Sequence, residues 1–518
     1  MKKQFKIICR NSKLSLIQGR TAKQLMEKTD PNVSVEVLSK PSRGDLDLTT
    51  PLYLMGDKNI FTKDIEDVLL AGEADFAVHS MKDISAEKLT DPNFKVAIIE
   101  RNDVRDVVIF NQNIFDLLQK GEKIRLGTSS LRREELIPTF LKKALPQLSN
   151  SPIEIETLTI RGNVDTRLRK LKNGDYDCIT LAAAGLNRLM VFESEIAEIL
   201  RGLPKMLMPI AEVPPAAGQG ALLVECLAKN KEASALIEKI NDPKLLSHIL
   251  KERDFTKQYG AGCHQRFGVV NFDVKGINLS IIKGKSDTQD VDDMDFETPF
   301  GDLIKDKKLF SASDFMRDFF DYQYFTLDDN FYSKLKKTKT IFVAHHRVAT
   351  DEGVLAVLKS KNCRENNENT EGPSVWASGT KTWYELAKKG VWIEGCSDGF
   401  GFEFLTPVFN RPLFKTDKKD ILILTNEAAE AHWQPDYNTA STYRLIDNLS
   451  PELIAEIKIS DAFFWTNYEQ YHICKPYLKP NALHACPAGK TAQLFENEGL
   501  TPVLFPNIKA FLVWKTKN

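Results

Sequence analysis

Residues 124–133, IRLGTSSLRR, contain the unit from which the first part of the chain is built. Ile124 to Leu126 predict a short buried strand, and Gly127 to Ser130 predict a polar turn. A helix is expected to begin directly after the turn, with Arg132 and Arg133 in its first turn. Strand, polar turn and helix in this order are typical of α/β domains with largely parallel sheets.

The same unit recurs on both sides of this stretch. Strands are expected at 5–9, 74–78, 153–158 and 176–181, and Ser12, Thr62 and Asn163 are candidate helix caps. Residues 260–310 contain shorter strand-like runs separated by turns rich in Asp and Gly. The first part of the chain therefore predicts an α/β fold with repeated strand–turn–helix units.

Composition and charge exclude several classes of protein. The 518 residues suit two to four domains, and 70 basic against 71 acidic side chains leave a net charge of −1. Bulk nucleic-acid binding normally needs a basic surplus, so no nucleic-acid partner is expected. We find no apolar run suited to a signal peptide or a membrane span, and therefore expect a cytoplasmic protein without a membrane partner.

The cysteines and tryptophans carry separate information. Eight scattered cysteines without a CxxC pair indicate reduced thiols, and no grouping of His, Cys and carboxylates has metal-ligand spacing, so no metal is expected. All six tryptophans lie after residue 375, which indicates two different proteins joined in one chain. The Lys-rich segment 332–339 is the expected seam.

Arginines follow several of the predicted strands. The carboxyl ends of parallel strands form ligand sites, and helix N-termini there attract anions. The planar guanidinium donates two parallel hydrogen bonds to a carboxylate or phosphate, so the cluster indicates a small polyanionic ligand. Surface salt bridges are the alternative for each arginine taken alone. The arginines in question are Arg10, Arg132, Arg133, Arg161, Arg167 and Arg188.

Two further positions could carry chemistry. Lys82 and Asp83 follow the strand at 74–78, where a carboxylate could stabilise a developing cation or move protons; a helix cap or a salt bridge is the alternative. Cys263 lies in a loop of small residues, where His264 and Arg266 could favour the thiolate. An idle loop thiol is the alternative for Cys263.

Nine short stretches together resemble one family over residues 4–310, hydroxymethylbilane synthase, which is also called porphobilinogen deaminase. Their order and spacing agree with that family over about 300 residues, and no single stretch carries the resemblance. The stretches are 10–14, 43–45, 61–64, 79–83, 127–133, 158–164, 182–186, 215–220 and 261–263.

The resemblance implies an α/β fold with two lobes like those of periplasmic binding proteins and a small α+β domain that carries the cofactor cysteine. A C-terminal α/β region follows. We expect the first lobe to comprise 1–104 with 201–222, and the second lobe to comprise 105–200. The small domain is expected at 223–330 and the C-terminal region at 339–518.

The resemblance also implies a reaction and a cofactor. Such an enzyme joins four porphobilinogen molecules head to tail with release of ammonia, and then frees the linear tetrapyrrole by hydrolysis. The growing chain is built on a dipyrromethane held by a thioether to the loop cysteine, here Cys263. Each pyrrole carries an acetate and a propionate, so the growing chain is a polycarboxylate of the kind that the arginines favour.

Residue roles carried over from the family are expectations of the same kind. Asp83 is the expected catalytic residue, and porphobilinogen and the growing chain are the expected partners of a monomer. The expected cofactor contacts are Lys82, Thr128, Ser130, Arg132 and Arg133. The expected substrate contacts are Arg10, Ser12, Phe61, Arg161, Arg167 and Arg188.

The C-terminal region resembles uroporphyrinogen-III synthase in four stretches, 340–344, 377–382, 461–467 and 486–492. The resemblance implies that this region cyclises the linear product to uroporphyrinogen III. A structural appendage without catalysis is the alternative. For the whole chain, an anion-binding module without catalysis is the rival hypothesis, and a covalent adduct of two pyrrole units would distinguish the enzyme from it.

Overall fold

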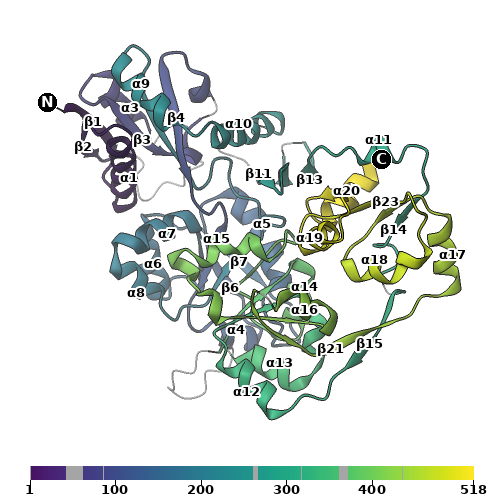
Figure 1. The fold of residues 1–518 in the computed structure, drawn as a ribbon. Helices are drawn as coiled ribbons and strands as arrows, with labels where there is room; N and C mark the ends of the chain where they lie inside the picture. Colours follow the sequence, from purple (N-terminus) through teal and green to yellow (C-terminus); the bar gives the residue numbers. More distant parts are fainter. Residues whose placement is uncertain are drawn as a thin grey trace.

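The structure is a computed structural model of the 518-residue chain. It describes residues 2–42, 62–85, 87–260, 266–286, 288–316, 318–360, 372–434 and 436–517. Figure 1 shows two lobes formed by the N-terminal half, with the C-terminal half packed beside them. Among the described residues, no helix is both long and apolar enough to cross a membrane.

The first lobe is built on a five-stranded sheet with the order β2-β1-β3-β10-β4. Strands β1, β2 and β3 run parallel, and β10 is antiparallel to its neighbours. The strands are β1 (Lys3–Arg10), β2 (Val33–Lys40), β3 (Phe76–Ser80), β4 (Phe94–Arg101) and β10 (Ala221–Leu227). The helices around this sheet are α1 (Lys13–Thr29), α3 (Lys63–Leu70) and α9 (Lys231–Ile240).

The second lobe repeats this plan with the order β7-β6-β8-β5-β9. Its strands are β5 (Asp106–Phe110), β6 (Ile124–Gly127), β7 (Ile155–Leu158), β8 (Cys178–Ala182) and β9 (Lys205–Leu207). Its helices are α4 (Ile114–Lys120), α5 (Leu131–Ala144), α6 (Val164–Lys172), α7 (Ala183–Phe192) and α8 (Ser194–Leu200). The stretch 124–133 thus forms the predicted strand, turn and helix, as β6 and the start of α5.

Two linkers join the lobes. The first linker, 102–105, connects β4 to β5, and the second linker, 208–220, connects β9 to β10. Residues 201–222 were expected to belong to the first lobe, and this boundary needs correction. Strand β9 pairs with β5 of the second lobe, whereas β10 completes the first sheet and α9 packs on it. The chain thus re-enters the first lobe only after the second linker.

A third sheet follows, and it is antiparallel with the order β11-β12-β13. It comprises β11 (Arg266–Val274), β12 (Ile277–Lys285) and β13 (Asp290–Asp295), and α10 (Pro243–Gln258) packs against β11. Asp242 begins α10 by accepting hydrogen bonds from the N–H groups of Lys244 and Leu245, which is ordinary N-capping. Helix α10 and strand β11 flank residues 261–265, which lie outside the described part of the chain.

The C-terminal region contains two parallel sheets joined by a two-stranded antiparallel ladder, β15 with β21. One sheet has the order β18-β17-β16-β19-β20, and the other has the order β14-β22-β23-β24. The strands are β14 (Leu309–Ser311), β15 (Phe320–Tyr324), β16 (Thr340–Val343), β17 (Ser374–Ala377), β18 (Gly395–Cys396), β19 (Ile421–Thr425), β20 (Asn438–Ser441), β21 (Tyr443–Asp447), β22 (Ala462–Phe464), β23 (Leu483–Pro487) and β24 (Val503–Phe505).

Helices surround both of these sheets (Figure 1). They are α11 (Phe300–Leu303), α12 (Asp329–Lys337), α13 (Glu352–Lys359), α14 (Thr380–Lys388), α15 (Thr406–Phe409), α16 (Glu427–Trp433), α17 (Pro451–Ile459), α18 (Tyr468–Cys474), α19 (Lys490–Asn497) and α20 (Ile508–Lys517).

The seam between the two parts lies earlier than expected. The Lys-rich segment at 332–339 is not a linker, because most of it belongs to α12, which Asp328 caps and which buries Leu335. Strand β14 pairs in parallel with β22 and so belongs to the C-terminal region, although it falls inside the small domain expected at 223–330. Phe300 of α11 already packs against Phe505 and Trp514. The seam therefore lies between the end of β13 and the start of α11.

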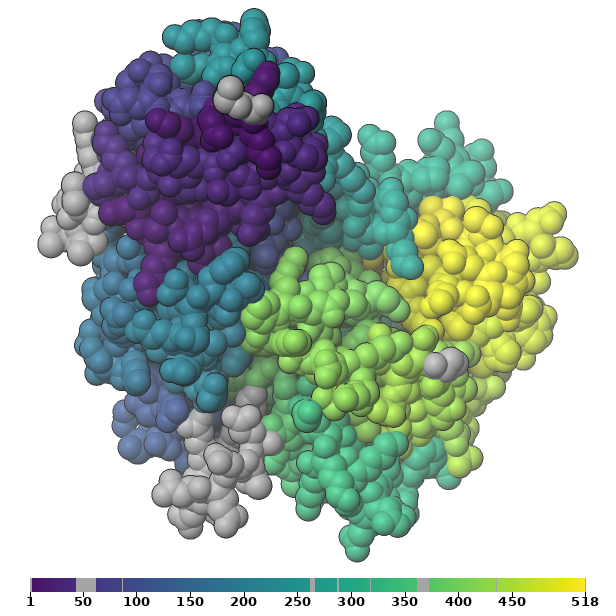
Figure 2. All heavy atoms as spheres, turned by 60° about the vertical axis from the view of Figure 1, so that its left-hand side comes forward, coloured from purple at the N-terminus to yellow at the C-terminus, as the bar shows by residue number. Residues whose placement is uncertain are grey.

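The C-terminal region and the second lobe share one apolar core. Trp392 packs edge-on against Phe110 and Phe115, with ring centroids 5.0 and 5.1 Å apart. Trp383 packs in the same way on Phe140 of α5, at 5.1 Å. Both tryptophans are fully buried. Figure 2 shows the resulting close contact between the blue lobe and the green part of the C-terminal region.

Asp398 is a buried carboxylate at this contact. Its Oδ1 accepts a hydrogen bond from the backbone N–H of Ala211, at 3.1 Å, whereas its buried Oδ2 has no hydrogen-bond partner among the described residues. Burial raises the pKa of Asp398 to about 6, although the nearby Arg105 opposes the change. The folded protein therefore binds a proton here more tightly than the unfolded chain does.

Asp398→Asn is expected to stabilise the protein at neutral pH and to have little effect near pH 4. The free energy of unfolding should fall as the pH rises from about 4 to about 6, because in that window the unfolded chain releases a proton that the folded protein still holds. Two pKa units correspond to about 2–3 kcal/mol, and the amide oxygen keeps the acceptor for Ala211. Thermal unfolding at pH 4.5 and 7.5 measures the effect.

Asp461→Asn is the matched control. The pKa of Asp461 lies below its usual range because Lys479 hydrogen-bonds to this exposed carboxylate. Its replacement should give no gain in stability at pH 7.5. An equal gain from both variants would contradict the assignment to burial.

Candidate active site

A cavity of about 390 Å³ lies between the two lobes. Among the described residues with an expected site role, all except Thr128 line it. They are Arg10, Ser12, Lys82, Asp83, Ser130, Arg132, Arg133, Arg161, Arg167 and Arg188. Phe61 and Cys263 also had expected roles, and both lie outside the described residues. Residues from five separate stretches of the sequence thus meet at one place.

The wall of this cavity is strongly basic. Among the described residues, eight basic side chains line it, against two acidic side chains, Asp83 and Asp165. The volume falls within the range of about 300–1,000 Å³ that is usual for small-molecule sites. A ligand with several carboxylates would compensate the excess positive charge.

Arg132 and Arg133 lie at the start of α5 and share one buried carboxylate. Arg132 Nη2 lies 2.6 Å from Asp106 Oδ2, and Arg133 Nη2 lies 2.7 Å from Asp106 Oδ1. Burial acts to raise the pKa of Asp106, but the two guanidinium groups outweigh it and hold that pKa well below its usual range. Asp106 therefore remains charged and fixes the orientation of both arginines.

Both arginines keep an unused donor. The Nε atoms of Arg132 and Arg133 are buried and have no hydrogen-bond partner among the described residues. A buried donor without a partner costs about 1–3 kcal/mol. This arrangement fits side chains that complete their hydrogen bonds only when an anionic ligand is present.

Asp106 is a site residue that the sequence did not reveal. It begins the apolar strand β5, where an acidic residue resembles an ordinary strand end. Gln219 lies in the stretch 215–220 that resembles the family but had no expected role; its Nε2 donates to Asp106 Oδ1 at 2.9 Å and to Val104 O at 2.7 Å. The one signal in the sequence is an acidic residue directly before the apolar run 107–110.

Arg161 and Arg167 form a second basic group on the same lobe. Arg161 is buried after β7, and Arg167 lies in the first turns of α6. Arg167 Nε donates to Gly162 O at 2.7 Å, and among the described residues no carboxylate lies within ion-pair distance of it. Burial, with Arg133 and Arg161 nearby, lowers the pKa of Arg167 to about 10. Arg167 is therefore a charged group without a counter-ion in the part of the chain that the structure describes.

Arg188 joins the two lobes. It lies on α7 of the second lobe, and its Nη2 contacts Glu100 Oε1 of β4 at 2.7 Å. The same Nη2 donates to Gly220 O at 2.8 Å, at the end of the second linker. Glu100 was not among the expected site residues. The Glu100 carboxylate thus binds the Arg188 guanidinium, which was expected to bind a substrate carboxylate.

Asp83 and Lys82 lie in a short 3₁₀ turn, Met81–Asp83, directly after β3. Asp83 is half-buried, and its carboxylate has no hydrogen bond or ion pair among the described residues. The Lys82 side chain is exposed to the space inside the cavity. The surrounding cavity walls keep it away from bulk water, which lowers its pKa, while the adjacent Asp83 opposes that effect. Asp83 is thus a carboxylate available to a ligand.

The remaining expected residues shape the walls. Arg10 ends β1, and Ser12 caps α1 by accepting a hydrogen bond from Ser15 N at 3.2 Å. Ser130 borders the cavity at the start of α5. Thr128 is fully buried behind it, and its hydroxyl accepts a hydrogen bond from Ser130 N at 3.2 Å. Thr128 therefore supports the turn rather than the cavity wall.

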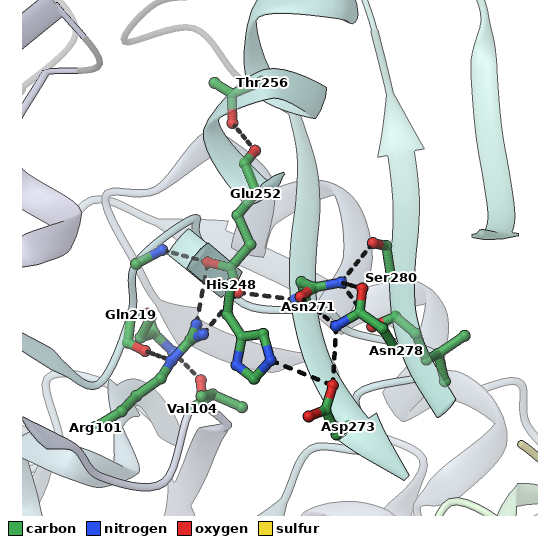
Figure 3. A network of polar contacts seen from close by, with 12 residues as sticks. Arg101, Val104, Gln219, His248, Glu252, Thr256, Asn271, Asp273, Asn278 and Ser280 are labelled. Atoms are coloured by element: carbon green, nitrogen blue, oxygen red, sulfur yellow. Dashed lines mark hydrogen bonds and ion pairs between the residues drawn. The ribbon is translucent and has the colours of Figure 1, made fainter. Parts of the chain in front are cut away.

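A polar network anchors the third sheet beside this cavity (Figure 3). The buried Glu252 of α10 pairs with Arg101 at 2.7 Å and accepts from Gly218 N at 2.7 Å. It also accepts from Asn271 N of β11 at 2.8 Å. One carboxylate thus fixes α10 and β11, the two elements flanking residues 261–265, against the linker that borders the cavity.

No group of three or more His, Cys, Asp or Glu side chains suited to a metal occurs in the described part of the chain. The six described cysteines are buried and unpaired in disulfides. The described part of the site consists of arginines and one available carboxylate, with the anchored third sheet beside it. It is an α/β site, placed between two lobes, with the charge and volume for a polycarboxylate.

Comparison with known proteins identifies the family. The family model described as porphobilinogen deaminase, dipyromethane cofactor binding domain, matches residues 5–235. A porphobilinogen deaminase from Campylobacter hominis is 36% identical over 317 residues, which are 60% of this chain and 91% of that protein. A porphobilinogen deaminase from Prochlorococcus marinus is 38% identical over 52% of this chain and 79% of that protein. The chain belongs to the porphobilinogen deaminase family.

Solved structures resemble the chain only weakly. The probable amino-acid ABC transporter extracellular-binding protein from Bacillus subtilis covers 50% of this chain and 99% of its own, at 11% identity and a TM-score of 0.28. That score is too low to assign the fold, which rests on the sheets described above. The C-terminal region, from α11 onward, lies beyond the match to the family model.

Proposed function

We propose that the chain is a hydroxymethylbilane synthase, which condenses four porphobilinogen molecules and releases the linear tetrapyrrole. The single observation that carries this proposal is the cavity between the lobes, where the available Asp83 carboxylate faces six arginines. Family membership supplies the reaction, and the cavity supplies the chemistry that the reaction needs.

Arginines bind the carboxylates of the substrate and of the growing chain. Arg167 lacks a carboxylate partner among the described residues, and is available for this role. Arg188 must exchange Glu100 for a ligand carboxylate, so its binding is a competition. Charge-assisted hydrogen bonds of this kind contribute about 1.5–3 kcal/mol each. Together they orient the polycarboxylate in the cavity.

Asp83 acts on the reacting groups. Its carboxylate stabilises the cation that forms when ammonia leaves porphobilinogen, and it accepts and returns the proton during coupling. Because Asp83 forms no hydrogen bond or ion pair with a described residue, its charge is available for this role. Lys82 beside it contributes a positive charge for a carboxylate.

The residues present fit a dipyrromethane cofactor. The unused Nε donors of Arg132 and Arg133 can bind its carboxylates, with Lys82 and Ser130 on the same wall. When bound, the dipyrromethane supplies the primer from which the pyrrole chain is extended. We assign its attachment to Cys263 from the family resemblance; in support, Glu252 anchors α10 and β11, the two elements that flank residues 261–265, to Gly218 of the second linker.

Cys263→Ser is expected to abolish the covalent adduct and most of the activity while leaving the fold intact. A hydroxyl is a far weaker nucleophile than a thiolate, so the thioether should not form. Intact-mass measurement of the purified protein checks this, because the parent should carry the mass of two pyrrole units. Cys226→Ser is the control, since Cys226 is buried and burial raises its pKa to about 11. An anion-binding module without catalysis would lack the adduct in all three proteins.

Arg132→Leu and Arg167→Leu are expected to fail in different ways. The first should yield protein without the adduct and with lower thermal stability, because a bound cofactor stabilises only the folded state. The second should keep the adduct but stall elongation, so that partly extended complexes accumulate. Mass spectra after brief exposure to porphobilinogen distinguish the two outcomes.

Arg125→Leu controls for the loss of a structural ion pair. Arg125 pairs with Asp177 on the same lobe at 2.8 Å, away from the cavity. This variant should keep both the adduct and elongation. Identical spectra for Arg132→Leu and Arg167→Leu would refute a division of the arginines into two functional sets.

For the C-terminal region we propose cyclisation of the product to uroporphyrinogen III. Three of the four stretches that suggest this activity fold as strand–turn–helix units, namely β17 with α14, β22 with α18, and β23 with α19. Incubation with porphobilinogen alone provides the test. A type III ring supports cyclisation by this region, whereas the symmetric type I ring from spontaneous closure makes the region a structural appendage.

A further inference from the structure

The C-terminal region contacts the first linker between the lobes. The Arg105 guanidinium stacks on the Phe404 ring, 4.8 Å from its centroid. Arg411 Nη1 lies 3.8 Å from Asp103 Oδ2. Asp103 and Arg105 are both buried, so water and salt weaken these contacts less than contacts on the open surface. Two of the four residues in the first linker are thus held from outside the lobes.

The same region also holds the second linker. Asp398 accepts a hydrogen bond from Ala211 N, and Lys509 Nζ donates to Ala211 O at 3.5 Å. Ile210 and Ala211 share a buried apolar cluster with Phe400, with Ala488, which follows β23, and with Ala510 of α20. The backbone of Ala211 is therefore fixed through both its donor and its acceptor.

Further contacts attach the C-terminal region to the elements on either side of the hinge, by which we mean the two linkers, 102–105 and 208–220. Leu207 N of β9 donates to Glu394 O at 2.7 Å, which fixes the start of the second linker. Phe272 of β11 contacts Phe400 at 5.6 Å and Phe404 at 5.8 Å. Figure 2 shows the C-terminal region pressed against the second lobe and the third sheet. The attachment thus surrounds the place where the chain crosses between lobes.

Linkers of this kind normally absorb the φ and ψ changes that open and close two lobes. Relative motion is the default for domains unless a large apolar interface restrains them. Here a large apolar interface exists, but it connects the second lobe and both linkers to the C-terminal region. Any opening of the lobes must therefore break contacts between the linkers and the C-terminal region.

We propose that the C-terminal region is a brace for the hinge, which limits how far the two lobes separate. The residues of this hinge brace are Asp398, Phe404, Arg411 and Lys509. The brace keeps Asp83 of the first lobe close to the arginines of the second. It acts whether or not the C-terminal region has an activity of its own, and its test does not depend on turnover.

Hydrogen–deuterium exchange of the full chain tests the brace. The double variant Phe404→Leu with Arg411→Gln removes both contacts to the first linker and leaves the cavity residues unchanged. Amides in residues 102–105 and 208–220 should exchange about tenfold faster, because local opening of the hinge costs less. Strands β1 and β8, at the centres of the lobes, should keep their protection.

The matched control is Phe325→Leu with Arg444→Gln. Arg444 stacks on the Phe325 ring, 5.3 Å from its centroid, and lies 3.6 Å from Glu427. The control therefore removes one arginine–ring contact and one arginine–carboxylate contact, as the brace variant does, at a place away from the linkers. This control should leave linker exchange unchanged. Unchanged exchange in the folded brace variant, or an equal increase in β1 and β8, would overturn the proposal.

A milder variant decides the question if the double variant does not fold. Arg411 is partly exposed, with 27% of its side chain accessible, so Arg411→Gln alone should fold. Faster exchange of residues 102–105 by about threefold supports the brace, since that contact alone is lost. Exchange equal to that of the parent would refute it.

Discussion

Asp83→Asn is expected to retain the covalent cofactor while turnover falls by at least about 10²–10³. Loss of one preorganised electrostatic contact typically costs that much, and loss of the proton relay adds to it. Asn keeps the shape of the side chain, and Asp83 forms no hydrogen bond or ion pair with a described residue, so the fold should not change. The rate of porphobilinogen consumption, with intact mass as a check on the adduct, measures the effect.

Asp165→Asn is the matched control, because Asp165 is the other acidic residue of the same cavity. It lies 3.7 Å from Arg169 on the surface of α6, and its charge is thus already paired. This variant should remain within a few-fold of the parent. If the Asp83 variant also kept that rate, Asp83 would be a structural residue and the proposed chemistry would be wrong.

A chain that ends after Thr298 is expected to be insoluble or unfolded, although it contains every residue of the cavity. Deletion uncovers Phe110, Phe115 and Phe140, which now pack against Trp383 and Trp392. Truncating one buried aromatic side chain costs about 3–5 kcal/mol, whereas a whole domain is stable by only about 5–15 kcal/mol. Soluble yield and the cooperativity of thermal unfolding provide the measurement.

Residues 299–518 supplied as a separate chain in the same cells are the control. They should restore solubility if the shared core is the cause. The soluble yield of the shortened chain can also be compared with that of the Campylobacter hominis relative, because the match spans 91% of that protein but only 60% of this chain. A soluble shortened chain with normal adduct mass would show that the second lobe is stable without its C-terminal partner.

Much of the cavity could be predicted because its residues follow strands. A strand and a turn can be recognised from a few neighbouring residues, so Arg132, Arg167 and Asp83 were found from local pattern. Asp106 and Glu100 could not be found in this way. Their importance comes from arginines on other elements, and one acidic residue in a strand does not indicate which side chain it faces.

The seam was misplaced for a related reason. Lysines at 334, 336 and 337 resemble a solvated linker in composition, yet they form the polar face of α12 while Leu335 is buried. The early strand Leu309–Ser311 finds its partner only in Ala462–Phe464. Parallel pairing between strands so far apart leaves no trace in local composition, because each strand is merely a short apolar run.

That distant pairing also affects how the protein is made. About 150 residues separate the end of β14 from the start of β22, its hydrogen-bonded neighbour. At a synthesis rate of about 5–20 residues per second, β14 leaves the ribosome roughly 8–30 s before its neighbour exists. Both lobes have been synthesised by then, while the apolar Leu309 and Phe310 remain without their sheet. We therefore expect the nascent chain to bind chaperones most strongly after the lobes have been synthesised, and to be released when β22 emerges.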